Sequence, residues 1–379
     1  MTHKIKRITH LATTYILLAF SLCFSLLSHA GEDTKRVVMV LSGYGENGGE
    51  TKPGYEFDEF AKAYLVFKQN NVGVDIASPQ GGSVEADKYD PSKGYNAKVL
   101  ADKSAMSKLN NTLAISALKA NQYDGIFVVG GKGAMFDLPN DKALQQLIAD
   151  IYQTNGTVAA VCHGPAALVD VKLSDGSYLV EDKAINSFTN EEEKLFGKKW
   201  IKSFDFMLED KLKSRGAQFQ SSDIMLNHVA VDQRLITGQN PTSTVAVATE
   251  LVRSLGITPA PATMDAEDKT LALVAQFIDG DTQALSVLKE SPADYHIALV
   301  GMYGFYYEML ADSTKEHENA LALMLSAQKT LNNPRLDLKI AQTQHKLGQS
   351  AQAKTTLEAL LANKPDFQPA VEMLKTLSM

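Results

Sequence analysis

Residues 159–165 read Ala-Ala-Val-Cys-His-Gly-Pro, and the fold can be worked out from them. The apolar run 157–161 has the composition of a buried β-strand, and the Gly-Pro pair after His163 can open a helix, because proline is tolerated in a first helical turn. A cysteine between a strand and a helix stands where a nucleophile elbow exposes its side chain, at the carboxyl end of a sheet. We therefore predict that Cys162 is a nucleophile. The alternative is an inert core thiol, which is common for this residue type.

Short apolar runs and longer helical stretches alternate on both sides of this turn, from Lys35 to about Leu255. Strands that are apolar on both faces, separated by helices, predict a parallel sheet covered on both sides. The sequence therefore predicts a three-layer α/β domain. We expect strands at 36–42, 74–77, 123–129 and 157–161, a hairpin at 229–237, and helices at 55–69, 141–153 and 244–255.

The character of the chain changes after Gly256. Residues 258–263 contain two prolines and form a short stiff linker. Residues 264–379 are rich in Ala, Leu, Lys and Gln, show no convincing strand and predict an all-α domain. Within it, residues 340–365 have the spacing of a tetratricopeptide unit, and residues 322–334 repeat its second half. The sequence leaves open whether this domain is a plain helical appendage or a peptide-binding groove.

The first thirty residues form a separate segment. Three positive charges precede an apolar run at 11–27, and small residues precede Gly31. This pattern predicts a secretory signal peptide over residues 1–30, with an uncleaved membrane anchor as the alternative. The catalytic domain would then span residues 31–257. We expect export across the inner membrane, most simply to the periplasm, and a mature chain that is not embedded in the membrane.

The charge and the cysteine count limit the partners. The chain of 379 residues has a net charge of −7, and loss of the three positive charges makes it more acidic. Such a chain has no electrostatic basis for binding nucleic acid. Cleavage would also remove Cys23 and leave Cys162 as a single thiol, which cannot form an internal disulfide. The histidines are dispersed, without Cys-x-x-Cys or His-x-x-x-His, so we expect no metal site.

Four motifs resemble one protein family. The segment Cys162-His163-Gly164-Pro165 resembles the nucleophile motif of the ThiJ/PfpI superfamily, relatives of the class I glutamine amidotransferases. Residues 130–139 (GGKGAMFDLP), 75–82 (DIASPQGG) and 187–193 (SFTNEEE) resemble the branch of heat-shock-type chaperones that act as glutathione-independent glyoxalase III. The similarity spans about residues 36–256. This resemblance implies a flavodoxin-like three-layer sandwich with a mostly parallel sheet. The usual member of the family has no counterpart to the leader or to the helical extension.

The resemblance implies a role for a glutamate of the first helix. In the family this carboxyl touches the cysteine sulfur, and Glu59 fits the register. Glu56, one turn earlier, is the rival. Ala63 stands where the family usually has proline, which puts a local helix bend in doubt. The alternative is that Glu59 is a solvated surface carboxylate, as glutamates commonly are.

The resemblance also implies a base and an oxyanion hole. His163 would be the general base, oriented by the glutamate that ends the T-N-x-E-E motif. That position is Glu193, with Glu192 one place away. The amides of Gly131 and His163, next to Gly130, would hold the oxyanion.

By resemblance, the expected activity is conversion of methylglyoxal, a small 2-oxoaldehyde, to lactate. This activity would require no glutathione, metal or other cofactor. Two alternatives stay open: a protein deglycase or peptidase-like hydrolase, and a holdase chaperone or interaction protein that uses the helical extension. A homodimer and a protein partner for that extension are also compatible with the sequence.

Two further expectations concern the cysteine and the extension. Amides behind an exposed elbow predict that the Cys162 thiol is unusually acidic. Because every candidate residue precedes Gly256, we expect the chemistry to survive removal of the extension. The alternative is that the aromatic residues of 303–307 cover the mouth of the pocket, since clefts between domains are common binding sites.

Overall fold

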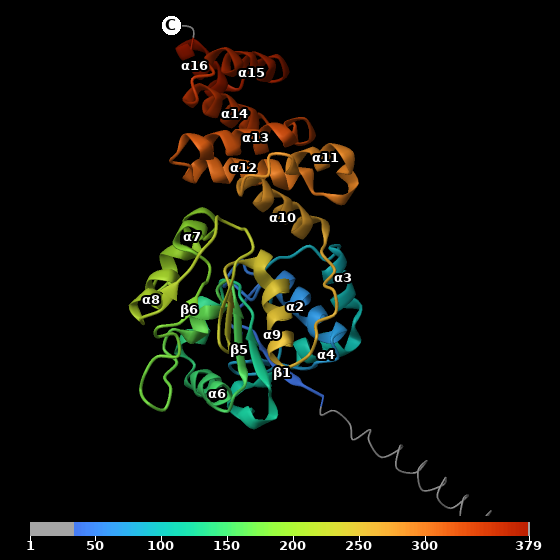
Figure 1. Cartoon of the computed structure of the whole chain (residues 1–379), viewed down its shortest axis with the longest axis vertical. Coiled ribbons are helices and arrows are strands. Elements are labelled where there is room, and N and C mark those ends of the chain that lie inside the picture. Colours follow the sequence, from blue (N-terminus) through green and yellow to red (C-terminus); the bar gives the residue numbers. More distant parts are fainter. Residues whose placement is uncertain (1–33, 378–379) are drawn as a thin grey trace, which may run out of the picture.

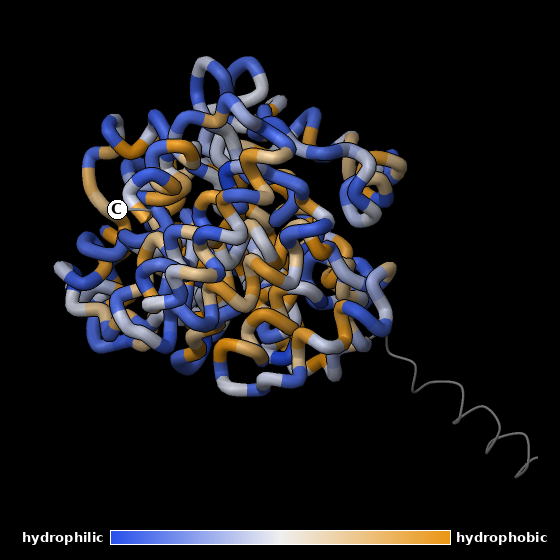
Figure 2. The backbone as a smooth tube through the Cα atoms, turned by 90° about the horizontal axis from the view of Figure 1, so that it is seen from above, coloured by the Kyte–Doolittle hydropathy of each residue, from blue (hydrophilic) through white to orange (hydrophobic). Residues whose placement is uncertain are grey.

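The computed structural model describes residues 34–377, so the predicted signal peptide lies outside the described residues. Figure 1 shows an α/β part carrying the early segments of the chain and, above it, a stack of helices formed by the later segments. In Figure 2 the strongly apolar segments gather toward the middle of the view, and hydrophilic segments predominate at the periphery. None of the helices within residues 34–377 combines the length and the apolar character needed to cross a membrane.

A seven-stranded sheet forms the centre of the α/β part, with the strand order β3-β2-β1-β4-β5-β9-β8. All neighbouring strands run parallel except β8 and β9, which form the predicted hairpin. The mostly parallel three-layer architecture is therefore confirmed. The strands are β1 (Arg36–Val40), β2 (Gly73–Ser78), β3 (Leu113–Ala114), β4 (Gly125–Val128), β5 (Thr157–Val161), β8 (Val229–Asp232) and β9 (Leu235–Gly238). A separate pair consists of β6 (Ala184–Ile185) and β7 (Gln218–Phe219).

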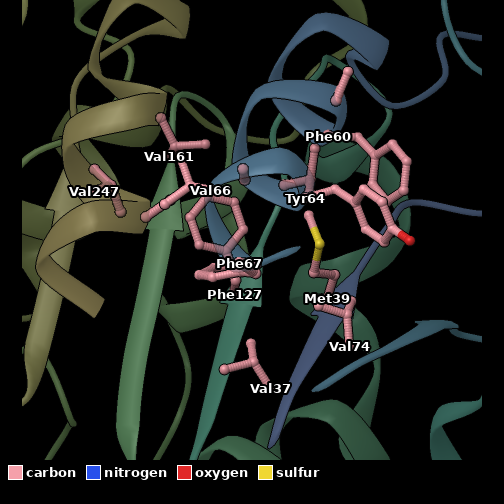
Figure 3. Packing of buried hydrophobic residues seen from close by; sticks show 14 of the residues in the cluster. Val37, Met39, Phe60, Tyr64, Val66, Phe67, Val74, Phe127, Val161 and Val247 are labelled. Atoms are coloured by element: carbon pink, nitrogen blue, oxygen red, sulfur yellow. The ribbon is translucent and has the colours of Figure 1, made fainter. Parts of the chain in front are cut away.

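Alternate residues of each strand face two different hydrophobic clusters, as the pleat of a strand requires. In β1, Val37 and Met39 join the cluster shown in Figure 3, whereas Val38 and Val40 join the cluster on the other face. The first face is covered by α2 (Phe57–Gln69), α3 (Gly94–Ala101), α4 (Lys103–Asn110) and α9 (Thr244–Ser254). The second is covered by α5 (Ala134–Asp137), α6 (Lys142–Gln153) and α8 (Leu208–Ser214).

The later part of the chain is helical, and residues 264–377 contain no strand. Its helices are α10 (Ala266–Ile278), α11 (Val287–Glu290), α12 (Ile297–Leu310), α13 (Thr314–Leu331), α14 (Pro334–Lys346), α15 (Ser350–Asn363) and α16 (Gln368–Leu377). The remaining elements are the helix α7 (Asn190–Phe196) and short 3-10 turns: η1 (Ile115–Ala117), η2 (Ala120–Gln122), η3 (Leu138–Asn140), η4 (Gly164–Leu168), η5 (Trp200–Ser203), η6 (Pro241–Ser243), η7 (Ala284–Ser286) and η8 (Pro292–Asp294).

The two parts share buried contacts. Ile224 and Leu226, from the loop before β8, are 3% and 5% exposed and belong to the same hydrophobic cluster as Leu271, Val300 and Tyr303 of the helical part. This loop of the α/β part therefore supplies apolar side chains to the core of the helical part.

Candidate active site

Cys162 follows directly on β5 and has a φ angle of +59°, in the left-handed region that non-glycine residues rarely adopt. Such a conformation costs about 1–3 kcal/mol and persists only when its surroundings enforce it. Here the Cys162 amide donates to the Gly238 carbonyl at 2.8 Å, and the Cys162 carbonyl accepts from the Phe188 amide at 2.9 Å. These two bonds hold the sharp turn expected of a nucleophile elbow.

Burial of the cysteine differs from the sequence-based expectation. Cys162 is only 4% exposed, whereas we expected an exposed side chain. Burial and the neighbouring Glu59 carboxyl raise the pKa of the Cys162 thiol well above its ordinary value, so the expectation of an acidic thiol is wrong. The element after the elbow is η4, a 3-10 turn of five residues, and such a short element has little dipole to offset the burial.

Glu59 lies in the first turn of α2 and is completely buried. Its Oε2 accepts a hydrogen bond from the Gly130 amide at 2.7 Å, and the carboxyl also hydrogen-bonds to Cys162. Its Oε1 has no hydrogen-bond partner among the described residues. α2 continues without a break through Ala63. The helix therefore delivers Glu59 to the cysteine, and the bend that Ala63 put in doubt does not interrupt it.

The buried carboxyl and thiol behave as a coupled pair. Burial raises the pKa of Glu59 well above its ordinary value, and the nearby Glu56 raises it further. A carboxylate and a thiolate in this buried site would repel each other, so their titrations are coupled and the first proton lost belongs to the pair rather than to either group. Lys132 opposes the rise, because its positive charge lowers the pKa of Cys162.

His163 lies between the thiol and a second buried carboxylate. Its Nδ1 is 3.4 Å from the Cys162 Sγ, and its Nε2 is 2.7 Å from the Glu193 Oε2. The His163 ring packs against Phe188, with ring centroids 4.6 Å apart. A histidine that contacts a thiol through one nitrogen and a carboxylate through the other is oriented for acid–base work.

Glu192 and Glu193 are adjacent on α7 (Asn190–Phe196) and do different things. Glu192 forms a capping box with Thr189, and its Oε1 accepts from the Met225 amide at 2.7 Å and the Asn240 side chain at 2.9 Å. The structure thus brings Glu193 to His163, while Glu192 ties α7 to the loops before β8 and after β9.

The two glycines after β4 lie against Glu59 and against the backbone of Glu56. A side chain at Gly130 would lie 2.7 Å from the Glu59 Oε2 and 2.8 Å from the Cys162 Cβ, so only glycine fits. Because the Gly130 amide is already bonded to Glu59, it does not serve the oxyanion role expected of this segment. Gly131 has a φ angle of +95°, and neither its amide nor that of His163 donates to another described residue. These two amides remain available to a ligand.

Glu56, the rival carboxyl, is half-buried at the start of α2. Its amide donates to the Gly130 carbonyl at 3.1 Å. Burial, reinforced by Asp58 and Asp87, raises the pKa of Glu56 to about 7. Glu59, not Glu56, is the carboxyl that hydrogen-bonds to the thiol.

Sequence reasoning missed two residues around the site. Phe188 packs on the catalytic histidine candidate, and Lys132 affects the cysteine electrostatically. Both lie inside motifs that carry the family resemblance, so their positions in the sequence could have indicated that they lie near the site. Within residues 34–377, no group of three or more His, Cys, Asp and Glu residues is arranged to hold a metal ion.

Comparison with known proteins supports the same relationship. Glutathione-independent glyoxalase HSP31 of Saccharomyces cerevisiae is 31% identical over 235 residues, which cover 58% of this chain and 98% of that protein. Glutathione-independent glyoxalase hsp3102 of Schizosaccharomyces pombe is 30% identical over 220 residues, covering 53% and 89%. The crystal structure of glyoxalase III from Candida albicans superposes with a TM-score of 0.54 at 27% identity, covering 58% of this chain and 97% of that one.

The sequence profile of the DJ-1/PfpI family matches residues 51–254, which is more than half of the chain and ends before α10. The matched region contains the elbow cysteine, the histidine beside it and both buried glutamates. The chain therefore belongs to the DJ-1/PfpI family.

Proposed function

We propose that this protein is a glutathione-independent glyoxalase that converts small 2-oxoaldehydes such as methylglyoxal to 2-hydroxy acids such as lactate. The observation that carries the proposal is the buried line of Cys162, His163 and Glu193, with Glu59 on the thiol. The relatives named above, which bear the glyoxalase name, support it. The burial of Cys162, which is 4% exposed, favours a three-carbon aldehyde over a peptide or a glycated protein, because a bulky substrate cannot reach its side chain.

The reaction would begin at the sulfur. Cys162 Sγ adds to the aldehyde carbon, and the thiol proton passes to His163 Nδ1, 3.4 Å away. The aldehyde oxygen becomes an oxyanion within reach of the Gly131 and His163 amides, and His163 then returns the proton to it. The product is a hemithioacetal bound to the enzyme.

His163 would next act as base and acid in turn. It removes the proton from the former aldehyde carbon to give an enediolate, and it delivers that proton to the neighbouring carbon. The hydroxyl proton on the former aldehyde oxygen passes to the neighbouring oxygen in the same rearrangement. The former aldehyde carbon becomes a thioester carbonyl, and the neighbouring carbon carries a hydroxyl. Water then cleaves the thioester, which releases the 2-hydroxy acid and restores the thiol. Throughout, Glu193 would hold the imidazole through Nε2.

A direct assay tests the proposal. Purified full-length protein is incubated with methylglyoxal in the absence of glutathione, and lactate is quantified. We expect lactate to form, and Cys162→Ser and His163→Ala to abolish it. His228→Asn serves as a matched control, because His228 is bonded to Ser222 and lies outside the buried line. Full activity in Cys162→Ser, or no lactate from the folded wild-type protein, would refute the proposal.

We also propose that the protein is exported to the periplasm. The support is the pattern of residues 1–30, which predicts a signal peptide. Cell fractionation followed by intact-mass measurement tests this proposal. The expected result is a periplasmic protein that begins near Gly31, and a cytoplasmic protein that retains residue 1 would contradict it.

A further inference from the structure

The two acids of the proposed site lie on two different helices, and the helical part of the protein contacts both. Glu59 belongs to α2 and Glu193 to α7. In each helix, the residue three positions after the acid contacts the helical part. Residues three apart lie on neighbouring positions of a helix face, so such a contact restrains the turn that carries the acid.

On α2, that residue is Lys62. Its Nζ is 2.7 Å from Asp268 Oδ1 and 3.4 Å from Asp265 Oδ2, at the start of α10. The Lys62 and Asp268 side chains are each only 9% exposed. A buried pair of this kind is strongly destabilised when one partner is removed, because the other charge is left without compensation.

On α7, that residue is Phe196. Its ring meets the ring of Tyr306 from α12 in a T-shaped contact, with centroids 5.0 Å apart. Its neighbour Leu195 packs against the hydrophobic cluster of the helical part. Phe196 also packs against the main cluster of the sheet, so it bridges the two cores.

A second path reaches α7 through the loop before β8. The Met225 amide donates to the Glu192 carboxylate, which anchors the first turn of α7 next to Glu193. The residues on either side of Met225, Ile224 and Leu226, are buried in the core of the helical part. The helical part therefore fixes both ends of α7. Figure 1 shows α10 lying between the α/β part and the helices stacked above it.

We propose that the helical part acts as a clamp on the α2 and α7 helices, holding Glu59 and Glu193 at their working distances from the thiol and the imidazole. Lys62 and Tyr306 are then positioning residues. They contact neither Cys162 nor His163 but fix the helices that do. This inference rests on the proposed function only where it is tested by enzyme kinetics; the test by alkylation of Cys162 does not require that function.

Tyr306 variants of the full-length protein test the α7 side of the clamp. Tyr306→Ala should lower kcat by about tenfold or more while KM changes little, because small displacements of catalytic groups reduce rates steeply. Tyr306→Phe retains the ring contact and should restore the rate. Leu357→Ala removes a buried side chain in the outer cluster of α14, α15 and α16, away from both acid helices, and serves as the control.

Lys62 variants test the α2 side. Lys62→Met should shift the pH midpoint at which Cys162 is alkylated, because Glu59 would move relative to the thiol. Lys68→Met is the matched control on the same helix, since Lys68 pairs with Asp102 of the α/β part. Alkylation of Cys162 is followed by peptide mass spectrometry, and circular dichroism confirms that each variant is folded.

The alkylation profile separates this inference from the proposed function. If the protein proves inactive on methylglyoxal, shifted alkylation midpoints in Lys62→Met and Tyr306→Ala would still support the clamp. Wild-type alkylation profiles in both folded variants would overturn it. Equal losses in Tyr306→Ala and Leu357→Ala would also overturn it, because they would show a general effect of destabilisation.

Discussion

At the scale of single residues, the ionisation of Cys162 is coupled to that of Glu59. Both groups are buried, and the Gly130 amide bonds to one carboxylate oxygen. The charge of Glu59 opposes formation of the thiolate, and its neutral form does not. The ionisation of this pair therefore sets how much thiolate the enzyme contains at a given pH.

We predict that Glu59→Gln lowers the pH midpoint of Cys162 alkylation. The amide cannot ionise, so the negative charge that raises the pKa of the thiol is lost. Below the wild-type midpoint, the variant should therefore alkylate faster than the wild type. The measurement is the rate of iodoacetamide labelling at Cys162 between about pH 5 and pH 10, a range that brackets an ordinary thiol.

Glu56→Gln is the control for this prediction, because Glu56 acts on the pair only from a distance. It should shift the midpoint less than Glu59→Gln does. A higher midpoint in Glu59→Gln would mean that protonated Glu59 stabilises the thiolate, and the assignment of charge within the pair would have to be reversed.

At the scale of elements, α7 shows how a short helix assigns different tasks to adjacent acids. Thr189 caps the helix and fixes its rotation through Glu192, so that the next side chain reaches His163. The run of three glutamates predicts a helix start, since acids there favour the helix dipole. It does not reveal which glutamate faces inward, because that depends on contacts with Met225 and Asn240 far along the chain.

We predict opposite effects for the two acids. Glu193→Gln should lower kcat by about a hundredfold or more with little change in melting temperature, because it leaves His163 misoriented. Glu192→Gln should lower the free energy of unfolding by about 1–3 kcal/mol, because buried donors lose their charged acceptor. Steady-state kinetics and thermal melts of both variants check this. If only Glu192→Gln lost activity, the assignment of Glu193 as the partner of the imidazole would be wrong.

The sequence predicts the central strands well because they are buried on both faces and read as continuous apolar runs. β5 begins and ends where the sequence places it, and β1, β2 and β4 lie within one or two residues of the predicted bounds. The pair of β6 and β7 was missed, since two-residue strands carry no periodicity. The burial of Cys162 was missed as well, because it results from loops far apart in the chain.

At the scale of the whole molecule, the two parts are less independent of each other than the proline-containing linker suggests. Composition marks where the helical part begins, but it does not show that Ile224 and Leu226 cross the boundary. A usable signal was present: three apolar residues, Ile224 to Leu226, interrupt an otherwise polar loop. The expectation that the chemistry survives removal of residues after 257 stays a prediction, and the clamp predicts the opposite outcome.

We predict that the full-length protein unfolds in one calorimetric transition rather than two. The buried Lys62–Asp268 pair and the shared apolar cluster couple the stability of the two parts. Differential scanning calorimetry should give equal calorimetric and van't Hoff enthalpies. Leu357→Ala should then lower the temperature of the whole transition. Two resolved peaks, of which Leu357→Ala shifts only one, would show that the parts unfold independently.

The apolar loop before β8 also constrains how this gene can change. Ile224 and Leu226 are buried by helices that begin only at Ala266, later in the chain. A frameshift or stop codon in the linker would therefore leave these side chains in water, on a protein whose sheet and elbow are otherwise intact. Exposed apolar segments of this kind promote aggregation. Loss of the helical extension would thus be deleterious because it lowers the solubility of the protein. For this reason alone, selection would retain the helices even where catalysis did not require them.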